Sequence, residues 1–351
     1  MIPTPRSDLG VSKGYHSSQI DVRIRLNTNE SPFPPPAELL ERWSELVTKL
    51  PLNRYPDRHA IELCKDIARF HNVSSDMVFV ANGSNEVLLN LLLSYGGKGA
   101  KALSFEPTYA MYETISRMTS TSYVALERDA DFLIEARDLL QRVDEVDPEV
   151  IFLCQPNNPT GIIESDEILD ILTDRGKSLI VVDEAYGQFC QESSIGRVNE
   201  NENLVVVRTF SKIWALAGMR IGYCIANKEI IDVLWNVTLP YHLDMSKALL
   251  ASLSFDYVPE METRVSMLIH ERERVSKELA VLGFTVWPSG TNFVLFRPNG
   301  VDGSKLWHRL VQEGILIRDW TSWPRLDNCL RVTIGTEYEN DQFLAALSNV
   351  F

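Results

Sequence analysis

Short runs of almost continuous apolar residues alternate with amphipathic segments along much of the chain. Six of these runs have the length of a β-strand: residues 77–81, 102–105, 150–154, 179–183, 204–209 and 221–225. Helical patterns lie between them, at residues 86–95, 109–118 and 165–173. Apolar runs without alternation are typical of strands that are covered on both faces. The order of strands and helices therefore predicts an α/β domain with a mostly parallel central sheet.

The pattern changes after about residue 240. A long helical pattern at 260–282 is followed by shorter elements. Strands are expected at 285–287, 293–296, 315–318 and 329–334, and helices at 303–313 and 339–350. This mixture of strands and helices predicts a smaller α+β domain.

The first 36 residues end in Ser-Pro-Phe-Pro-Pro-Pro, a segment that excludes a helix or a central strand. We therefore expect residues 1–36 to form an arm that belongs to the small domain. Residues 37–240 are expected to form the large domain and residues 241–351 the rest of the small one.

Composition and charge narrow the class of protein. The 351 residues are 45% hydrophobic and 23% charged, which is typical of soluble globular proteins and excludes extensive disorder. The 34 basic and 48 acidic residues give a net charge of −14, which argues against nucleic acid as the main partner. Neither a membrane-spanning stretch nor a secretory signal is recognised, and the five cysteines have no paired spacing. We expect a cytoplasmic protein with reduced thiols, no metal site and no membrane partner.

The strongest chemical signal lies directly after the apolar run 204–209. Ser211 and Lys212 emerge at the carboxyl end of this expected strand, where open α/β sheets bind ligands. A lysine in such a place is most often a solvated surface residue. Here Ser211 and Arg220 offer anion-binding groups, and the intervening residues are largely apolar. An amine in apolar surroundings near a cation has a lowered pKa and becomes a usable nucleophile towards a carbonyl.

Four further segments carry polar residues where expected elements end. Asp183 ends a buried strand, where a carboxylate needs a cation or strong donor, although it could equally cap a helix. The loop 154–161 by itself predicts only a turn. Residues 82–86 begin a helix, and could either cap it or present its N–H groups to a phosphate. Arg318 and Arg331, on adjacent strand edges, could converge on one dianion.

Together these segments resemble the pyridoxal-phosphate enzymes of the aspartate-aminotransferase-like fold type I, and within them the histidinol-phosphate aminotransferases. The resemblance covers nearly the whole chain. It rests on eight segments in the same order: 26–32, 54–57, 82–86, 106–112, 156–161, 183–186, 210–212 and 330–336. The proline-rich segment 31–36 departs from the family, which more often has Asn-Pro and a glycine-containing turn there.

The resemblance implies roles for the matching residues. Lys212 would bond covalently to the aldehyde of pyridoxal 5'-phosphate and later move the Cα proton of the substrate, and Asp183 would pair with the pyridinium nitrogen. Asn157 and Tyr186 would donate to the phenolate oxygen, with Tyr186 counted among the catalytic residues. The remaining contacts to the cofactor are implied for Tyr109, which would stack on the ring, and for the phosphate-binding residues Ser84, Asn85, Ser211 and Arg220. Tyr55 would reach the cofactor phosphate of the neighbouring subunit in a homodimer.

The implied reaction converts L-histidinol phosphate and 2-oxoglutarate to imidazole-acetol phosphate and L-glutamate, with ping-pong kinetics, in histidine biosynthesis. Arg331 is the expected anchor for the substrate anion and Arg318 the second cation. Further substrate contacts are expected from Tyr15, Asn29 and Tyr241. An aromatic amino-acid aminotransferase of the same subfamily remains an alternative. A less favoured one is a pyridoxal-phosphate decarboxylase of a phosphorylated amino acid.

Overall fold

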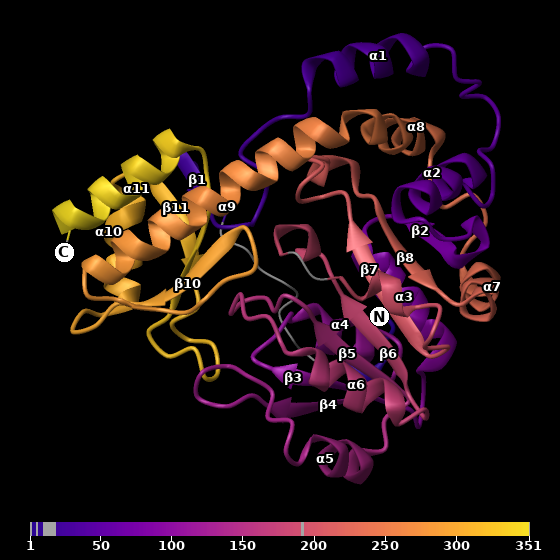
Figure 1. The fold of residues 1–351 in the computed structure, drawn as a ribbon, viewed down its shortest axis with the longest axis horizontal. Helices are drawn as coiled ribbons and strands as arrows, with labels where there is room; N and C mark the ends of the chain where they lie inside the picture. Colours follow the sequence, from indigo (N-terminus) through magenta and orange to yellow (C-terminus); the bar gives the residue numbers. More distant parts are fainter. Residues whose placement is uncertain (1, 5, 10–18, 191–192, 351) are drawn as a thin grey trace.

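Seven strands form the larger of two sheets in the computed structural model, which describes residues 2–4, 6–9, 19–190 and 193–350 (Figure 1). The strand order is β2-β8-β7-β6-β5-β3-β4, and β8 runs opposite to the other six strands. The bounds are β2 Val78–Ala81, β3 Lys101–Glu106, β4 Ser122–Glu127, β5 Val150–Cys154, β6 Leu179–Asp183, β7 Leu204–Thr209 and β8 Gly222–Ala226. Strands are present at all six predicted positions, which confirms the mostly parallel sheet; β4 is additional.

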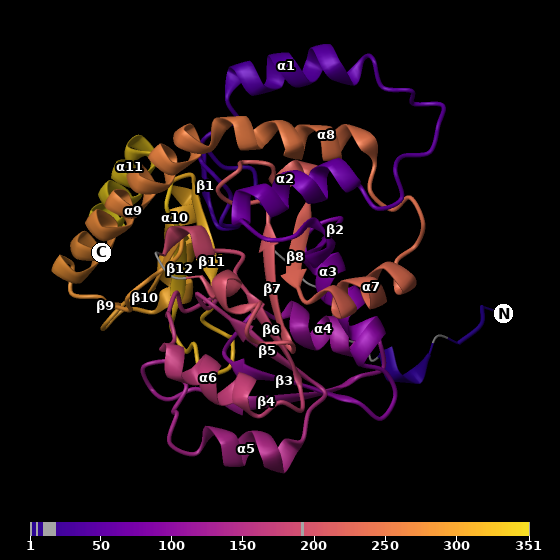
Figure 2. The same ribbon diagram turned by 45° about the vertical axis from the view of Figure 1, so that its right-hand side comes forward.

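Helices cover both faces of this sheet, because successive side chains of each buried strand point to opposite sides. Val181 packs on one face, in a cluster with side chains of α3 (Ser84–Tyr95), α4 (Met111–Met118) and α7 (Lys228–Val237). Its neighbour Val182 packs on the other face. That second cluster includes side chains of α2 (Ile61–His71), α5 (Leu139–Val146), α6 (Asp166–Asp174) and α8 (Met245–Ser254). Figure 2 shows these helices on the two sides of the strands, with α1 (Ala37–Val47) outside α8.

The smaller sheet has five strands in the order β1-β11-β12-β10-β9. Only β1 and β11 pair in parallel, so the sheet is mixed. The bounds are β1 Ile24–Leu26, β9 Thr285–Val286, β10 Phe293–Arg297, β11 Ile315–Asp319 and β12 Leu330–Thr333. The strand β1 comes from the N-terminal segment, so part of the expected arm is built into this sheet. The division of the chain at residue 240 stays a prediction.

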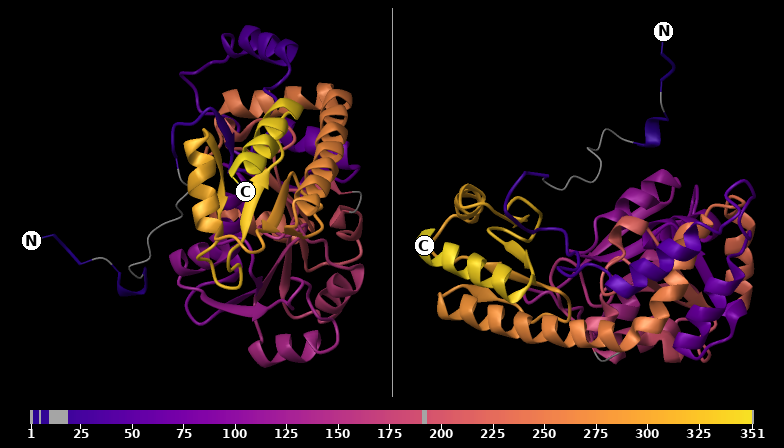
Figure 3. Two further views of the ribbon diagram at one scale, coloured as in Figure 1. Left: turned by 90° about the vertical axis from the view of Figure 1, so that its left-hand side faces the viewer. Right: turned by 90° about the horizontal axis from the view of Figure 1, so that it is seen from above.

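Three helices accompany the smaller sheet: α9 (Val258–Val281), α10 (Gly303–Gln312) and α11 (Glu337–Val350). Figures 1 and 3 show α9 extending from α8, beside the larger sheet, along the smaller one. Arg272 of α9 donates hydrogen bonds to Phe189 O and Thr291 O, which follow β6 and precede β10. The helix therefore ties the two sheets together. No helix among the described residues combines the length and apolar character that crossing a membrane requires.

Candidate active site

A cavity of about 350 Å³ lies between the carboxyl ends of the central strands and the smaller sheet. Its wall contains residues that follow β6 and β7, the start of α3, the segment after β1, and β12. Ten residues expected from the sequence line it: Asn29, Ser84, Asn85, Tyr109, Asp183, Tyr186, Ser211, Lys212, Arg220 and Arg331. Asn29 and Arg331, more than 300 positions apart in the chain, therefore line the same cavity.

Lys212 lines this cavity and lies three residues after the end of β7. Its Nζ donates to Thr28 O at 3.3 Å and lies 5.4 Å from the centroid of the Tyr186 ring. Burial lowers the pKa of Lys212 to about 7, and the positive charge of Arg331 acts in the same direction. Glu30 and Asp183 oppose this shift in pKa with their negative charges. A large fraction of the amine is therefore neutral at neutral pH and available as a nucleophile or base.

Asp183 ends β6 as a buried carboxylate. Its Oδ2 accepts a hydrogen bond from the hydroxyl of Tyr112 at 3.0 Å, and its Oδ1 accepts the N–H of Ala185 at 3.1 Å. Burial raises the pKa of Asp183 to about 6, against the effect of these two hydrogen bonds. Tyr112 lies within a segment used for the resemblance, but the sequence pattern gives it no role. A cation facing Asp183 in the cavity would find a carboxylate that is already oriented.

Asn29 connects the two sheets at the next part of the wall. Its Nδ2 donates to the hydroxyl of Tyr186 at 2.8 Å, and its Oδ1 accepts from Thr333 Oγ1 at 3.0 Å. Its backbone has a φ of 57°, in the left-handed region that asparagine tolerates better than most residues. The segment after β1 therefore fixes the orientation of the Tyr186 hydroxyl.

The start of α3 and the loop around Arg220 form an anion-binding corner. Arg220 Nη1 donates to Ser211 Oγ at 3.2 Å. Glycine is needed twice: a Cβ on Gly83, whose φ is +87°, would lie 2.6 Å from Arg220 Nη2, and one on Gly222 would lie 2.2 Å from the backbone N of Ser84. The free N–H groups of a helix N-terminus beside a guanidinium suit a phosphate group. Tyr109 donates to Asn85 Oδ1 at 3.1 Å at the rim of this corner.

Arg331 lies in a different part of the wall and is buried. Its guanidinium donates to Asn158 Oδ1 at 2.5 Å and to Asn27 O at 3.1 Å. Its Cζ lies 4.7 Å from the centroid of the Phe293 ring and 5.6 Å from that of Trp320. These contacts hold the plane of the guanidinium in one orientation.

The structure places Asn158, and not the expected Asn157, on the cavity wall. Asn157 is fully buried, and its Nδ2 donates to Pro107 O at 3.0 Å and to Thr160 Oγ1 at 2.8 Å. Both N–H groups of Asn157 are thus used in hydrogen bonds to the segment after β3 and to its own loop, whereas Asn158 faces the cavity. The sequence offers two adjacent asparagines, and only the loop conformation distinguishes them. Sequence reasoning also missed Thr28, Glu30 and Trp320 in the wall.

Three expected residues, Arg318, Tyr55 and Tyr241, are not part of the wall of this cavity. Arg318 is the strand partner of Arg331, as expected for adjacent strands, but is absent from the cavity wall and lies 5.2 Å from the centroid of the Trp320 ring. Tyr55 is 80% exposed and stacks on Tyr241, with 4.5 Å between ring centroids. Tyr15 is outside the described residues.

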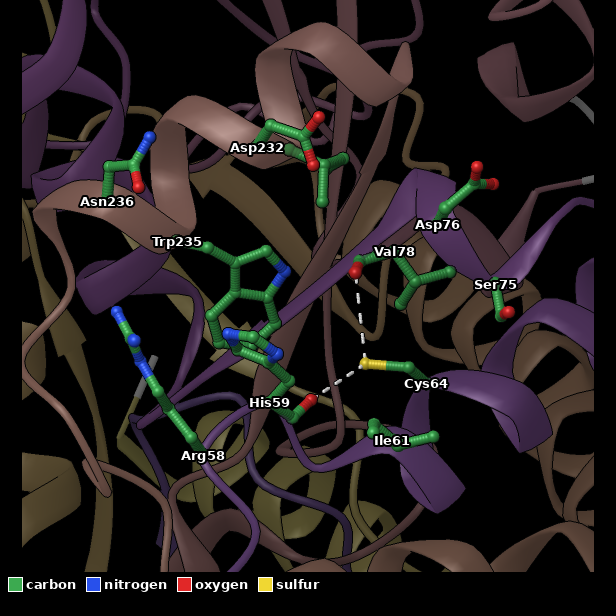
Figure 4. A pocket seen from close by; sticks show the side chains of 11 residues that line it. Arg58, His59, Ile61, Cys64, Ser75, Asp76, Val78, Asp232, Trp235 and Asn236 are labelled. Atoms are coloured by element: carbon green, nitrogen blue, oxygen red, sulfur yellow. Dashed lines mark hydrogen bonds between the residues drawn. The ribbon is translucent and has the colours of Figure 1, made fainter.

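A second cavity, of about 550 Å³, lies between α2 and α7 (Figure 4). Trp235 and His59 pack against each other there, and Cys64 Sγ is within 3.4 Å of His59 O. Its wall contains none of the expected site residues. Among the described residues, no group of three or more His, Cys, Asp or Glu side chains could hold a metal ion.

Comparisons with known proteins agree with this geometry. The sequence family described as aminotransferase class I and II matches residues 22–347. The histidinol-phosphate aminotransferase of Corynebacterium diphtheriae is 37% identical, over 98% of this chain and 96% of that protein. That of Mycobacterium marinum is 40% identical, over 98% of this chain and 92% of that protein.

The fold also has a close counterpart among solved structures. The histidinol-phosphate aminotransferase from Sinorhizobium meliloti, in complex with pyridoxal-5'-phosphate, has a TM-score of 0.86 at 23% identity. The superposition covers 94% of this chain and 90% of that one. This likeness confirms the fold that the sequence predicts.

Proposed function

Because the chain belongs to the class I and II aminotransferases, we propose that it transfers an amino group from L-histidinol phosphate to 2-oxoglutarate in histidine biosynthesis. The products are imidazole-acetol phosphate and L-glutamate. One observation carries this proposal: Lys212, Asp183 and two separate arginines, Arg220 and Arg331, line a single cavity. The first three suit a phosphorylated aldehyde cofactor, and Arg331 is left for a substrate anion.

The cofactor of this family, pyridoxal 5'-phosphate, fits the residues of the cavity. Gly83 and Gly222 leave space beside the start of α3 that any side chain would fill, where Arg220 would hold the phosphate together with Ser84 and Ser211. Further residues would hold the ring: Asp183 at the nitrogen, Tyr109 on its face, and Tyr186 and Asn158 at the phenolate oxygen. When bound, the cofactor supplies an electron sink for the charge that develops at the substrate Cα.

The residues of this chain then handle the proton. The displaced amine of Lys212, with its pKa lowered to about 7, takes the Cα proton and returns it to a different atom. Asp183, with a pKa of about 6, is mostly ionised at neutral pH and keeps its cationic partner protonated. Tyr186 and Asn29 form the hydrogen bond that orients the phenolate-binding hydroxyl.

Arg331 serves both half-reactions, because a phosphate monoester and a carboxylate both accept two hydrogen bonds from one guanidinium. The rings of Phe293 and Trp320 cover it and keep its donors directed. Arg318 lies against the Trp320 ring, outside the cavity wall, and would assist through its charge. We therefore expect Arg331→Gln to raise KM for both substrates far more than Arg318→Gln.

We also propose a cytoplasmic homodimer. Tyr55 and Tyr241 form an exposed aromatic pair, and neither side chain lines the cavity of its own chain. Aromatic side chains gathered on a surface are typical of interfaces. Tyr55 of one subunit would reach the cofactor phosphate of the other. The five cysteines are all free thiols, which suits a reducing compartment.

Half-transamination tests the proposal. The protein loaded with pyridoxal phosphate is mixed separately with histidinol phosphate, phenylalanine and phosphothreonine, and its visible absorbance is followed. Histidinol phosphate should bleach the band fastest, and 2-oxoglutarate should restore it. Faster bleaching by phenylalanine would favour the aromatic aminotransferase, and release of carbon dioxide without an acceptor would favour the decarboxylase. Lys212→Met should show neither bleaching nor borohydride-stable labelling.

A further inference from the structure

Glu184 and Arg208 form a buried ion pair close to the site, on the face of the larger sheet opposite to the side chain of Asp183. Glu184 directly follows Asp183, and Arg208 of β7 precedes Lys212 by four residues. Arg208 Nη2 and Nε donate to the same oxygen, Glu184 Oε2, at 2.6 and 3.0 Å. The side chains are 6% and 1% exposed, respectively. Because side chains alternate along a strand, the pair faces away from Asp183 while joining the ends of β6 and β7.

The pair also contacts the chain that follows Tyr186. A Cβ on Gly187 would lie 2.9 Å from Glu184 Cβ and 3.3 Å from Arg208 Nη2, so this segment passes directly over both side chains. Ser193 Oγ donates to Glu184 Oε2 at 2.9 Å, and the N–H of Ser194 donates to Glu184 Oε1 at 2.6 Å. The ion pair is thus bonded to, or packed against, three segments that carry Asp183, Tyr186 and Lys212.

Stability alone gives little reason for this arrangement. Apolar side chains of similar size commonly replace a buried ion pair with no loss of stability. The ion pair instead fixes the relative position of the two segments that it joins, because a guanidinium and a carboxylate bind in a fixed geometry. We infer that Glu184 and Arg208 are a positioning pair, which fixes the separation of Asp183 from Lys212 and the place of Tyr186. This inference rests on the proposed function, since it concerns the same three residues.

The chain provides a matched control in the ion pair of Arg128 and Glu164. Its side chains are 1% and 2% exposed, so its burial is equivalent. Arg128 also donates to Phe132 O at 3.0 Å, and Glu164 accepts the N–H of Ile134 at 3.1 Å. Neither residue of this pair adjoins Asp183, Tyr186 or Lys212 in the sequence. Loss of either ion pair should have a similar effect on folding, but only loss of the Glu184–Arg208 pair should disturb the geometry of the site.

The experiment compares the double variants Glu184→Gln/Arg208→Met and Arg128→Met/Glu164→Gln, which leave no buried charge unpaired. In the first, kcat should fall about 100-fold while KM changes by less than about threefold, since misplacing a reacting group by about 1 Å costs that much. The pH midpoint of the visible band of the loaded protein should also move. In the control, kcat should stay within about threefold of wild type at a similar melting temperature.

Arg208→Lys keeps the positive charge but loses the two hydrogen bonds that the guanidinium donates to Glu184. This single variant replaces the double variant in the experiment if the double variant does not fold. It should lower kcat about tenfold with an unchanged melting temperature. Equal losses of kcat in the two double variants, or an unchanged kcat in both Arg208 variants, would overturn the inference. If wild-type protein binds the cofactor but transaminates none of the substrates, the proposed function fails. The shift of the pH midpoint then still tests the positioning pair.

Discussion

The hydroxyl of Tyr112 donates a hydrogen bond to Asp183 across 3.0 Å, and both side chains are buried. The two residues come from α4 and β6, so their contact depends on the packing of that helix against the sheet. Burial raises the pKa of Asp183, whereas this hydrogen bond lowers it because it stabilises the ionised form. Tyr112 therefore helps to keep Asp183 charged.

Replacing Tyr112 with phenylalanine should raise the pKa of Asp183 further. A hydrogen bond to a charged group contributes about 1.5–3 kcal/mol, and one pKa unit corresponds to about 1.4 kcal/mol. The acidic limb of the kcat profile should therefore move to higher pH by about one to two units, with activity recovering as the pH rises. Tyr123→Phe is the control, since Tyr123 donates to Glu106 at 2.6 Å outside the cavity. An acidic limb identical to that of wild type would contradict this role.

The lowered pKa of Lys212 predicts how the stability of the cofactor-free protein varies with pH. Burial lowers this pKa from 10.5 to about 7, so the unfolded chain binds more protons than the folded one between these values. Stability should rise with pH across that window, and the cost of the buried charge is fully present below pH 7. Lys212→Met removes this cost, which amounts to at most about 1.4 kcal/mol for each unit of pKa shift.

Denaturant unfolding of the cofactor-free protein measures this effect. The stability gained by Lys212→Met should be greatest at pH 7 and below, and should shrink steadily as the pH approaches 10. Lys98→Met, at an exposed position, should give no such trend. A gain that does not vary with pH would mean that the amine is not desolvated.

The central strands could be predicted because each is buried on both faces. The runs at β5, β6 and β7 match their strands residue for residue, since these strands are buried along their whole length and most of their side chains are apolar. The two missed strands lie at sheet edges. In β4 exposed and half-buried residues are mixed, and β1 has only three residues, so neither gives a run. In addition, β1 pairs with β11, which is far away in the sequence, whereas β4 pairs with the preceding strand β3.

The strand pattern by itself predicted a site residue only where that residue lies at, or just after, the end of a strand. Asp183 and Lys212 follow directly from β6 and β7. The choice of Asn158 over Asn157 depends on how one loop turns its side chains. Arg318 and Arg331 pair as neighbouring strands suggest, yet only Arg331 lines the cavity, whereas Arg318 lies against the ring of Trp320. Such outcomes depend on packing, which the sequence pattern does not contain.

Asn157 should contribute mainly to the stability of the fold, and Asn158 mainly to activity. Asn157→Ala removes hydrogen bonds to Pro107 and Thr160 from a fully buried loop, and should lower the free energy of unfolding by about 1–3 kcal/mol. Asn158→Ala should leave stability nearly unchanged but lower kcat/KM, because it removes one of the hydrogen-bond partners of Arg331 and a group from the cavity wall. Unfolding curves and steady-state kinetics on both variants measure this. The reverse pattern would restore Asn157 as the functional residue.

Alanine substitutions at two glycines should distinguish the effect of backbone strain from the effect of disturbing the anion-binding corner. Gly83 and Gly97 have φ values of +87° and +106°, so alanine should destabilise either position by about 1 kcal/mol. Only at Gly83 would the new Cβ meet Arg220, 2.6 Å from Nη2, whereas nothing lies within 4 Å of a Cβ at Gly97. Gly83→Ala should therefore raise the Kd for pyridoxal phosphate about tenfold, because the displaced guanidinium loses a charge-assisted hydrogen bond. Absorbance titration measures the Kd, with Gly97→Ala as the control. Equal affinity in the two variants would show that Arg220 does not hold the phosphate.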